Sequence, residues 1–341
     1  MKTLTFVIPA YNSAHFLDKI LPSMLNPEVL PKLDIIIVND GSSDDTAGAA
    51  QKYCDLYPES LRLISQVNKG HGGALNTGCA AAQGKYLKVI DADDWVITEN
   101  LPEFVRQLEL CDSDVVLTHY HTVDISNGEI KEWKCFPREF RSPLTFEEIM
   151  ADWRNFKWSL TLHGITYKTA FYHQAGNILP EHVFYEDYCY ATFPCCLAQS
   201  VTPLDLFIYE YRIGDVNQSV SAANQLKRIG HTETVLQDML DKYSQLPEGH
   251  GKDYAATKIG ELFLSYLTTV LLVNPNKQEG RKLAMAQKNA IGRMAPEIIS
   301  AAEKKYRFFT LLNRLHISKK TWDAVMHSKI YNAIRKNYAQ S

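Results

Sequence analysis

The chain lacks the signatures of several common protein classes. Its seven cysteines form no C-x-x-C pair and no metal-site spacing, so we expect no disulfide framework and no zinc domain, but reduced thiols of the cytosolic kind. No uninterrupted apolar run reaches the ~18 residues of a membrane-spanning helix; the longest candidate, Phe263–Val273, predicts a buried helix. Pro9, Tyr11 and Asn12 end the first apolar run before a signal-peptide core could form, which predicts a first strand instead.

Two nucleotide-binding patterns are missing as well. No G-x-x-x-x-G-K-[ST] loop is present, which argues against a P-loop nucleotide hydrolase. Gly70-His71-Gly72-Gly73 is not a G-x-G-x-x-G fingerprint in the first β-α turn, which argues against a dinucleotide-dependent dehydrogenase. The sequence also contains no internal repeat and no low-complexity segment.

The composition is that of a folded chain with unevenly distributed charge. Hydrophobic residues make up 45% and charged residues 22% of the 341 residues, which excludes wholesale disorder and favours one large domain with an appendage, or two domains. The formal net charge is −3, but residues 301–341 hold nine Lys and Arg against two acidic residues, a net charge of +7 that leaves −10 elsewhere. A basic end on an acidic body indicates either a partner contact or a solvated helix face.

Strand-like and helix-like patterns alternate through the first 120 residues. The predicted strands are Leu4–Pro9, Ile35–Val38, Leu61–Ser65, Tyr86–Ile90 and Val115–Thr118. The predicted helices between them are Ala14–Leu25, Ser43–Tyr57, Gly73–Gln83 and Glu99–Leu110. This alternation predicts an α/β fold with a mostly parallel sheet flanked by helices, in which ligands bind at the carboxyl ends of the strands. Later patterns are helical, so we predict an α/β domain of residues 1–222 and an all-helical domain of residues 223–341.

A polar or glycine-rich motif follows each of the first four predicted strands. In chain order the motifs are Pro9-Ala10-Tyr11-Asn12, residues 39–46 (NDGSSDDT), residues 68–78 (NKGHGGALNTG) and Asp91-Ala92-Asp93-Asp94. Taken singly, most have a structural explanation: Ser43 or Asp44 would cap a helix, and the glycines would serve a tight turn and close packing. The acidic motif is harder to explain, because three clustered carboxylates repel one another unless a cation or a hydroxyl-rich ligand offsets them.

The acidic motif predicts a site for a metal-bound diphosphate. Hard cations such as Mg²⁺ and Mn²⁺ favour oxygen ligands and commonly take one or two protein carboxylates together with phosphate oxygens. A nucleotidyltransferase that makes an activated sugar is one kind of enzyme with such a site. It would be expected to have a glycine- and arginine-rich phosphate loop near residue 10, which this sequence lacks.

The motifs resemble, in order and spacing, those of the family-2 glycosyltransferases of the GT-A fold. The segments that carry the resemblance are VIPAYN, VNDGSSDDT, NKGHGGALNTG, DADD and FYEDYCY, within residues 1–222. The resemblance implies a nucleotide-sugar donor, most often a UDP-sugar, and inversion at the anomeric carbon. Many relatives read A-R-N-x-G where this chain has Ala74-Leu75-Asn76-Thr77-Gly78. Lys69 or Arg212 would therefore have to supply the charge of the missing arginine.

The resemblance also implies a role for each motif on the donor side. Pro9, Ala10 and Tyr11 would form a wall beside the nucleobase, and Asp40 would contact the base. Asn68, Lys69 and Gly73 would lie under the nucleotide, and Asp91 with Ala92 would contact the ribose. Asp93 would bind the metal, and Asp94 would orient the loop. His71 would touch phosphate and His163 would line the acceptor pocket, unless both are ordinary buried histidines.

Phe184-Tyr185-Glu186-Asp187-Tyr188 is the second constellation. An inverting transfer needs a base that accepts the proton of the attacking hydroxyl. The resemblance implies that Asp187 is this base and that Glu186 binds acceptor or positions the loop. The structural alternative is that both residues begin a helix, where acidic side chains favour the dipole. Relatives have a basic, serine-containing loop soon after this motif, and residues 211–221 resemble it. The resemblance implies that Arg212 in this loop would neutralise the departing diphosphate.

The sequence as a whole predicts a metal-dependent inverting glycosyltransferase. The expected cofactor is Mn²⁺ or Mg²⁺, the expected donor is a UDP-sugar, and the expected acceptor is a glycan, glycolipid or cell-wall polymer, with no nucleic-acid partner. The alternative is a non-catalytic nucleotide-sugar-binding module that scaffolds a synthesis complex.

The basic C-terminal helices predict a contact with a partner or with a membrane. Trp322, Val325, Ile330 and Ile334 have roughly helical spacing and would form either a core face or a membrane-facing stripe. The expected location is cytoplasmic, with peripheral attachment to the inner face of the plasma membrane as an option. An oligomer is also compatible with the sequence.

Overall fold

The computed structural model describes residues 2–136, 140, 142–215 and 222–326. It divides the chain into two compact units. The first consists of Met1–Val216 and Gln245–Ala255, and the second of Asn217–Ser244 and Ala256–Ser341. The domain boundary predicted after residue 222 stays a prediction.

The first unit is built on a nine-stranded mixed sheet. Its strand order is β3-β2-β1-β4-β8-β6-β9-β5, with β7 paired to β6. The strands are β1 (Leu4–Ala10), β2 (Leu33–Asp40), β3 (Leu61–Gln66), β4 (Tyr86–Val89), β5 (Trp95–Val96), β6 (Val115–Asp124), β7 (Glu129–Trp133), β8 (Ile165–Lys168) and β9 (Val201–Ile213). Strands β3, β2, β1 and β4 pair in parallel, as do β6 and β9, whereas β8, β7 and β5 join antiparallel.

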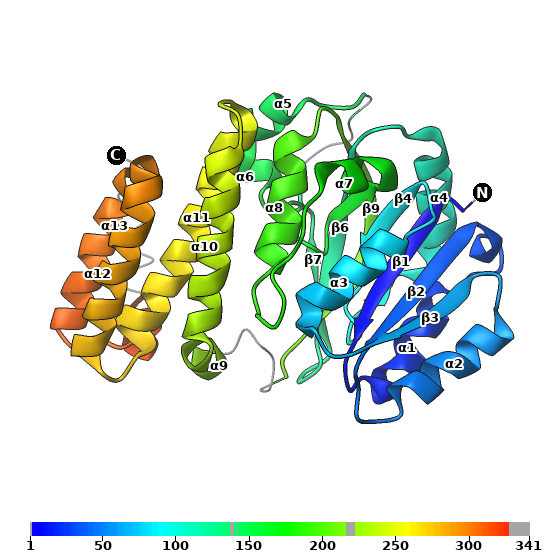
Figure 1. Ribbon diagram of the computed structural model, residues 1–341, viewed down its shortest axis with the longest axis horizontal. Coiled ribbons are helices and arrows are strands. Elements are labelled where there is room, and N and C mark those ends of the chain that lie inside the picture. The colour runs from blue at the N-terminus through cyan, green and yellow to red at the C-terminus, as the bar shows by residue number, and fades with distance from the viewer. Residues whose placement is uncertain (1, 137–139, 141, 216–221, 327–341) are drawn as a thin grey trace. The chain divides into compact units, whose positions relative to one another are not determined.

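Helices flank this sheet, as Figure 1 shows. They are α1 (Ala14–Met24), α2 (Thr46–Leu56), α3 (Gly70–Ala81), α4 (Leu101–Leu110), α5 (Phe146–Ala151), α6 (Trp153–Phe156), α7 (Thr169–Ala175) and α8 (Asp187–Leu197), with 3₁₀ turns η1 (Leu30–Lys32) and η2 (Thr98–Asn100). Every residue of β1 and β2 is buried, which is the burial expected of strands covered on both faces. The predicted α/β class is confirmed.

Helix α3 begins earlier than its sequence pattern predicts. The expected start was Gly73, but the helix begins at Gly70 and includes the glycine-rich segment as its first turn. Glycine disfavours helix in isolation, so close tertiary packing outweighs propensity here. A Cβ on Gly78 of this helix, for example, would lie 2.3 Å from Cγ1 of Val7 in β1.

After residue 222 the described residues form mainly helices. The elements are α9 (Ala222–Lys227), α10 (Ile229–Gln245), α11 (His250–Thr268), a π-helical turn η3 (Thr269–Val273), α12 (Lys277–Met294), α13 (Pro296–Arg314) and α14 (Lys319–Met326). Asn276 caps α12 by accepting a hydrogen bond from the backbone N–H of Glu279 at 3.0 Å, and Pro296 occupies the first turn of α13, where no N–H is needed. The predicted helical C-terminal region is therefore confirmed over these residues.

The helix His250–Val273 is long and apolar enough to cross a membrane by length and composition alone. A search for uninterrupted apolar runs misses it, because polar residues such as Lys258 and Ser265 interrupt the run. Of its most apolar window, 56% is buried inside the structure, and Phe263, Leu267 and Leu271 are each fully buried. This burial is that of a core helix, as predicted for Phe263–Val273.

Candidate functional site

The carboxyl ends of β1, β2 and β4 meet at one edge of the sheet. β1 pairs in parallel with both neighbours, so that Ala10 lies opposite Asn39, and Val7 lies opposite Val89. The motifs that follow these strands are therefore brought to one edge, although they are up to about 80 residues apart in sequence. The acidic motif, Asp91–Asp94, follows β4 at this edge.

Asp40, the last residue of β2, is buried and joins the second and third motifs. Its Oδ1 accepts hydrogen bonds from Nε2 of Gln66 (2.7 Å) and from the backbone N–H of Lys69 (2.9 Å). The Asn68 side chain donates to the backbone carbonyl of Asp40 at 2.9 Å. Gly41 has a φ of +69°, and a Cβ there would lie 2.7 Å from the backbone nitrogen of Asn68, so this turn requires glycine. Together these contacts hold the turn after β2 against Asn68 and Lys69.

The three residues predicted to wall the nucleobase differ in exposure. Tyr11 is 54% exposed, whereas Pro9 and Ala10 are buried as the last residues of β1. Of the three, Tyr11 is the one whose side chain a ligand can cover. Lys69 is also accessible, and its Nζ lies 3.5 Å from Oε1 of Glu181.

The acidic motif is held by residues of β9 and the segment after it. Nη1 of Arg212 lies 3.4 Å from Oδ2 of Asp93, and the backbone N–H of Arg212 donates to Oδ1 of Asp94 at 2.7 Å. Nη2 of Arg212 lies 2.8 Å from Oδ2 of Asp215. The Tyr209 hydroxyl donates to the other oxygen of Asp94. Arg212 thus reaches the predicted metal ligand directly, and Asp94 is a buried anchor for β9; its predicted orienting role stays a prediction.

The pKa values of these carboxyl groups diverge because their neighbours differ. Burial raises the pKa of Asp93, and the nearby charge of Asp91 raises it further. Burial also raises the pKa of Asp94 well above its usual range, with contributions from Asp91 and Asp93. Burial acts in the same direction on Asp91, but His71 outweighs it and lowers the pKa of Asp91. The cluster therefore carries more negative charge than its present partners offset, and a cation would relieve this repulsion.

The acidic motif fits a divalent cation if it supplies only some of the ligands and phosphate oxygens supply others. Among the residues that the structure describes, no group of three or more His, Cys, Asp or Glu side chains could hold a metal ion. Mg²⁺ and Mn²⁺ usually take few protein ligands when phosphate oxygens are available. The Asp93 side chain is 36% exposed and is repelled by Asp91, so one accessible carboxylate is in place for such a cation.

Glu186 and Asp187 begin helix α8, so the structural alternative describes their position correctly. Glu186 is the N-cap residue and is 2% exposed, whereas Asp187 is the first helical residue and is exposed. Burial raises the pKa of Tyr211, and the charges of Asp94, Asp91 and Asp187 raise it further. The predicted base and the acidic motif are therefore electrostatic neighbours of the same hydroxyl group.

The glycine-rich turn of α3 is packed against the segment that carries Glu186. A Cβ on Gly72 would lie 2.4 Å from the carbonyl oxygen of Pro180 and 2.9 Å from Cγ of Glu186. One turn later, Asn76 exchanges two hydrogen bonds with the backbone of Leu179, each 2.9 Å long. Close packing, one of the two explanations that the sequence left open for these glycines, is thus present at Gly72. Gly73 of the same turn faces Lys69.

His71 lies between the two groups of carboxylates. Its Nε2 is 2.9 Å from Oδ1 of Asp91, and its Nδ1 makes a short hydrogen bond with Oε1 of Glu186. The sequence left two interpretations of His71 open, a phosphate contact and an ordinary buried histidine; in the structure both ring nitrogens have carboxylate partners. No local pattern signals this bridge, because Glu186 lies 115 residues further along the chain.

Aromatic residues of β9 were missed as parts of the site. The His163 ring packs 4.2 Å from the ring of Tyr211 and 4.9 Å from that of Tyr209, centre to centre. Burial lowers the pKa of His163 to about 4, so this histidine is neutral at physiological pH. The strand alternation of Tyr209 and Tyr211 was a usable signal, since residues two apart share a face of a strand.

Residues 5–183, just over half of the chain, match Glycosyl transferase family 2. The chain belongs to this family. Its curated relatives include glycosyltransferase GlyG of Streptococcus pneumoniae, 29% identical over 160 residues, which are 44% of this chain and 51% of GlyG. Chondroitin synthase of Escherichia coli is 32% identical over 165 residues, which are 46% of this chain and 23% of that enzyme. The chain thus spans about half or less of the length of these relatives.

Solved structures with the same fold cover nearly the whole chain. TarS residues 1–349 of S. aureus, in complex with UDP-GlcNAc, superpose with a TM-score of 0.66 at 18% identity and cover 93% of both chains. The mannosyltransferase PcManGT of Pyrobaculum calidifontis, in complex with GDP-Man and Mn²⁺, has a TM-score of 0.50 at 17% identity over 91% of this chain and 84% of its own. At such identities the likeness establishes the fold alone. The first unit has the GT-A fold of family 2, followed by a helical C-terminal region.

Proposed function

We propose that this chain is an inverting glycosyltransferase that moves a sugar from a nucleotide diphosphate sugar, UDP-linked by preference, to a hydroxyl group of a glycan, glycolipid or cell-wall polymer. The observation that carries the proposal is the convergence of two groups of side chains in one unit. Asp91, Asp93 and Arg212 form the first group, and Glu186 with Asp187 forms the second. His71 lies between the two groups, with one ring nitrogen on Asp91 and the other on Glu186. UDP-GlcNAc in TarS and GDP-Man with Mn²⁺ in PcManGT support this class of donor.

The donor side would use the strand-end motifs. Tyr11 would cover the nucleobase, Asp40 would recognise it, and Asp91 would meet the ribose. Asp93 would hold Mn²⁺ or Mg²⁺, which would neutralise the diphosphate when bound. Arg212 offers a fixed cation beside Asp93, and such a cation stabilises charge that develops on a departing diphosphate.

The acceptor side would use the start of α8. Asp187 is exposed at the first position of this helix, so that an acceptor hydroxyl can approach it from solvent. The hydroxyl proton becomes acidic only as the new bond forms, and a carboxylate is a sufficient base for it. Glu186 is buried and would hold the loop or the acceptor, while Asp187 takes the proton.

The test is nucleotide release from a panel of UDP- and GDP-sugars with Mn²⁺, combined with calorimetry of UDP binding. Asp93→Asn should abolish most Mn²⁺-dependent UDP affinity and nearly all nucleotide release. Asp112→Asn is a matched control, because this exposed carboxylate pairs with Lys168 on the surface and should leave both properties unchanged. Unchanged Mn²⁺-dependent binding in Asp93→Asn would refute the metal assignment.

The same experiment separates the enzyme from the alternative, a non-catalytic nucleotide-sugar-binding module. Leu75, where many relatives have arginine, is the residue that favours the module; it is fully buried. A module would bind UDP with Mn²⁺ but would release no nucleotide from any donor of the panel, with or without glycan acceptors.

We further propose that the chain works in the cytoplasm, peripherally attached to an anionic membrane surface through one face of α13. On this face Phe308, Leu311 and the C-cap residue Leu315 are 40%, 51% and 61% exposed, and their spacing of three and four residues places them on one side of the helix. Their exposure is unusual because the opposite side of α13 already supplies buried core residues, Ile298 and Ala302 among them.

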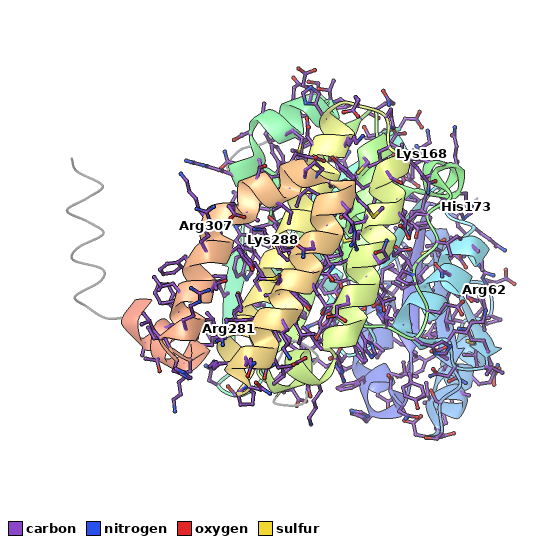
Figure 2. All side chains as sticks on the ribbon, turned by 60° about the vertical axis from the view of Figure 1, so that its left-hand side comes forward. Arg62, Lys168, His173, Arg281, Lys288 and Arg307 are labelled. Carbon is purple, nitrogen blue, oxygen red and sulfur yellow. The ribbon has the colours of Figure 1, made fainter. Side chains whose placement is uncertain are left out.

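Basic residues border this apolar face. Lys304, Arg307 and Arg314 are exposed around it, and Figure 2 labels Arg307 and, on α12, Lys288. Glu303 offsets part of the charge, since it pairs with both Lys288 and Arg307 at 2.7 Å. A basic face with apolar side chains is typical of interfacial helices, and each basic residue near an anionic surface contributes about 1 kcal/mol.

Part of the predicted C-terminal stripe belongs to the same surface. The Trp322 ring of α14 packs against that of Phe308, with ring centres 5.2 Å apart. Ile330 and Ile334 lie outside the described residues. Trp322 would therefore extend the apolar face of α13.

Vesicle co-sedimentation tests the attachment. The full chain should bind phosphatidylglycerol vesicles in low salt and phosphatidylcholine vesicles much less. Replacing Phe308, Leu311 and Leu315 with serine should remove this binding. Leu56→Ser with Leu110→Ser is the control, because both side chains are exposed apolar residues of the first unit. Equal binding by the α13 variant and the control would contradict the proposal.

A further inference from the structure

His71 connects two carboxylates that belong to different parts of the site. It is the second residue of α3, Asp91 follows β4, and Glu186 precedes α8. Nε2 of the imidazole faces Oδ1 of Asp91 at 2.9 Å, and Nδ1 faces Oε1 of Glu186. With a carboxylate oxygen at each ring nitrogen, both nitrogens must donate, and an imidazole can do so only when it carries both protons.

The charges around His71 favour this doubly protonated form. Burial disfavours the cation, but the charges of Asp91 and Glu186 outweigh burial and raise the pKa of His71 well above its usual range. Lys69, the N-cap residue of α3, pairs with Glu181, and the two charges offset each other. His163, the next histidine near Asp91, is neutral because burial lowers its pKa to about 4. The cation in this position is thus His71.

Glu186 depends on this bridge for its orientation. Its side chain is 3% exposed, and its Oε2 is buried with no hydrogen-bond partner among the described residues. The backbone before it is strained, since Tyr185 has a φ of +75°, a conformation that costs free energy for a residue other than glycine. A contact that fixes the Glu186 carboxylate therefore also helps to fix Asp187, the next residue.

We propose that His71 is a positioning residue that ties the ribose-contacting Asp91 to Glu186 and thereby holds Asp187 in the orientation needed for proton acceptance. This inference rests on the proposed function, in which Asp91 belongs to the donor side and Asp187 is the base. In this role His71 would touch neither the reacting atoms nor the metal. It acts through Glu186.

Histidine NMR tests the bridge without any turnover. In the full chain labelled with ¹⁵N-histidine, the signal that disappears in His71→Gln should have the pattern of an imidazolium protonated at both nitrogens at about pH 8, well above the ordinary histidine pKa of about 6.5. Glu186→Gln should return that signal toward a neutral ring. A neutral His71 ring at this pH in the unmodified protein would overturn the bridge.

Kinetics then test the positioning role with the donor that the nucleotide-release panel selects. His71→Gln should lower kcat by about 100-fold, the loss typical of a displaced catalytic group, with little change in the KM for donor. The double variant of His71→Gln with Glu186→Gln should lose no more kcat than the less active of the two single variants, because both changes break the same connection. Losses that multiply would overturn the proposal, and so would an unchanged kcat in His71→Gln.

His173→Gln is the matched control. His173 lies on α7 and is labelled in Figure 2; its Nε2 is 2.8 Å from the carbonyl oxygen of Cys79. Its replacement should leave kcat and the NMR signal of His71 unchanged. If the unmodified protein releases no nucleotide from any donor, the proposed function fails, whereas the NMR experiment still decides whether the bridge exists.

Discussion

Lys88 is a buried amine of β4, three residues before Asp91. It is fully buried, and its Nζ donates to the carbonyl oxygens of His163 (2.7 Å) and Ile165 (3.1 Å). Burial lowers its pKa to about 7. Even the neutral amine keeps two N–H groups, which suffice for both carbonyls. Lys88 therefore supports the segment that carries His163 without a permanent charge.

The lowered pKa of Lys88 predicts a particular pH dependence of stability. The unfolded chain binds this proton below a pH of about 10.4, but the folded chain binds it only below about 7. The free energy of unfolding is therefore highest above the unfolded pKa of Lys88 and falls as the pH drops toward 7, by up to about 1.4 kcal/mol per pH unit. The reason is that only the unfolded chain binds the proton in this range. Lys88→Met should flatten this slope in urea unfolding between pH 7 and pH 10. An unchanged slope would contradict the assignment.

Asp187 carries the sharpest catalytic prediction at the scale of one residue. Asp187→Asn keeps the size of the side chain and removes the base, so the rate of transfer should fall by about 10²–10⁴-fold. UDP affinity with Mn²⁺, measured by calorimetry, should stay close to that of the unmodified protein, because Asp93 and Arg212 are untouched. A transfer rate equal to the unmodified one would exclude Asp187 as the base.

At the scale of elements, α3 connects the strand-end motifs with the start of α8. Its first turn holds His71 against Asp91, and its packing requires Gly72. Two turns further on, the small Gly78 lets the helix approach β1. The glycines of this helix cost intrinsic helix stability and permit contacts that a larger residue would block.

Gly72→Ala should therefore destabilise the protein although alanine favours helix. The new Cβ would lie 2.4 Å from the carbonyl oxygen of Pro180, and relief of this overlap should cost about 1–3 kcal/mol. Gly260→Ala in α11 is the control, because its Cβ would meet Ile298 at 3.9 Å. That change should stabilise by about 0.5–1 kcal/mol. Equal effects of the two variants in urea unfolding would contradict the packing argument.

At the scale of the whole molecule, the two ends of the parallel strands have different tasks. The carboxyl ends carry the site, whereas the opposite end of β2 carries Asp34, a buried carboxylate. Asp34 accepts hydrogen bonds from Nε and Nη2 of Arg62 at 2.8 and 3.0 Å and from the Thr5 hydroxyl at 2.9 Å. Figure 2 labels Arg62. These contacts connect β1, β2 and β3 away from the site.

Asp34→Ala should lower stability without changing the chemistry. Loss of the buried carboxylate leaves Arg62 and Thr5 without this partner and should cost roughly 3 kcal/mol, the low end of the range because the Arg62 side chain is 34% exposed. Nucleotide affinity should not change. Glu103→Gln, which breaks the exposed pair with Arg106, should change stability little. A loss of UDP affinity in Asp34→Ala at temperatures where the fold persists would contradict this division.

The sequence alone identified the alternation of strands and helices, the α/β class and the motifs at the strand ends. These features are local: burial on both faces makes β1 and β2 continuous apolar runs, and parallel pairing brings their carboxyl ends to one edge. Asp93 and Asp187 could be chosen from such patterns together with the family resemblance. Periodicity also predicted the helices after residue 222, because each carries its own apolar face.

Tertiary packing decided what no local pattern encodes. Helix α3 starts at Gly70 because its glycines are stabilised by neighbours from distant segments, against their own propensity. The antiparallel pairs β4–β8 and β5–β9 join segments that lie far apart in the sequence. His71 reaches Asp91 and Glu186 across 20 and 115 residues, and Arg212 reaches Asp93 across 119. The residue types were visible in the sequence, but their partners follow from the way the sheet and helices bring remote side chains together.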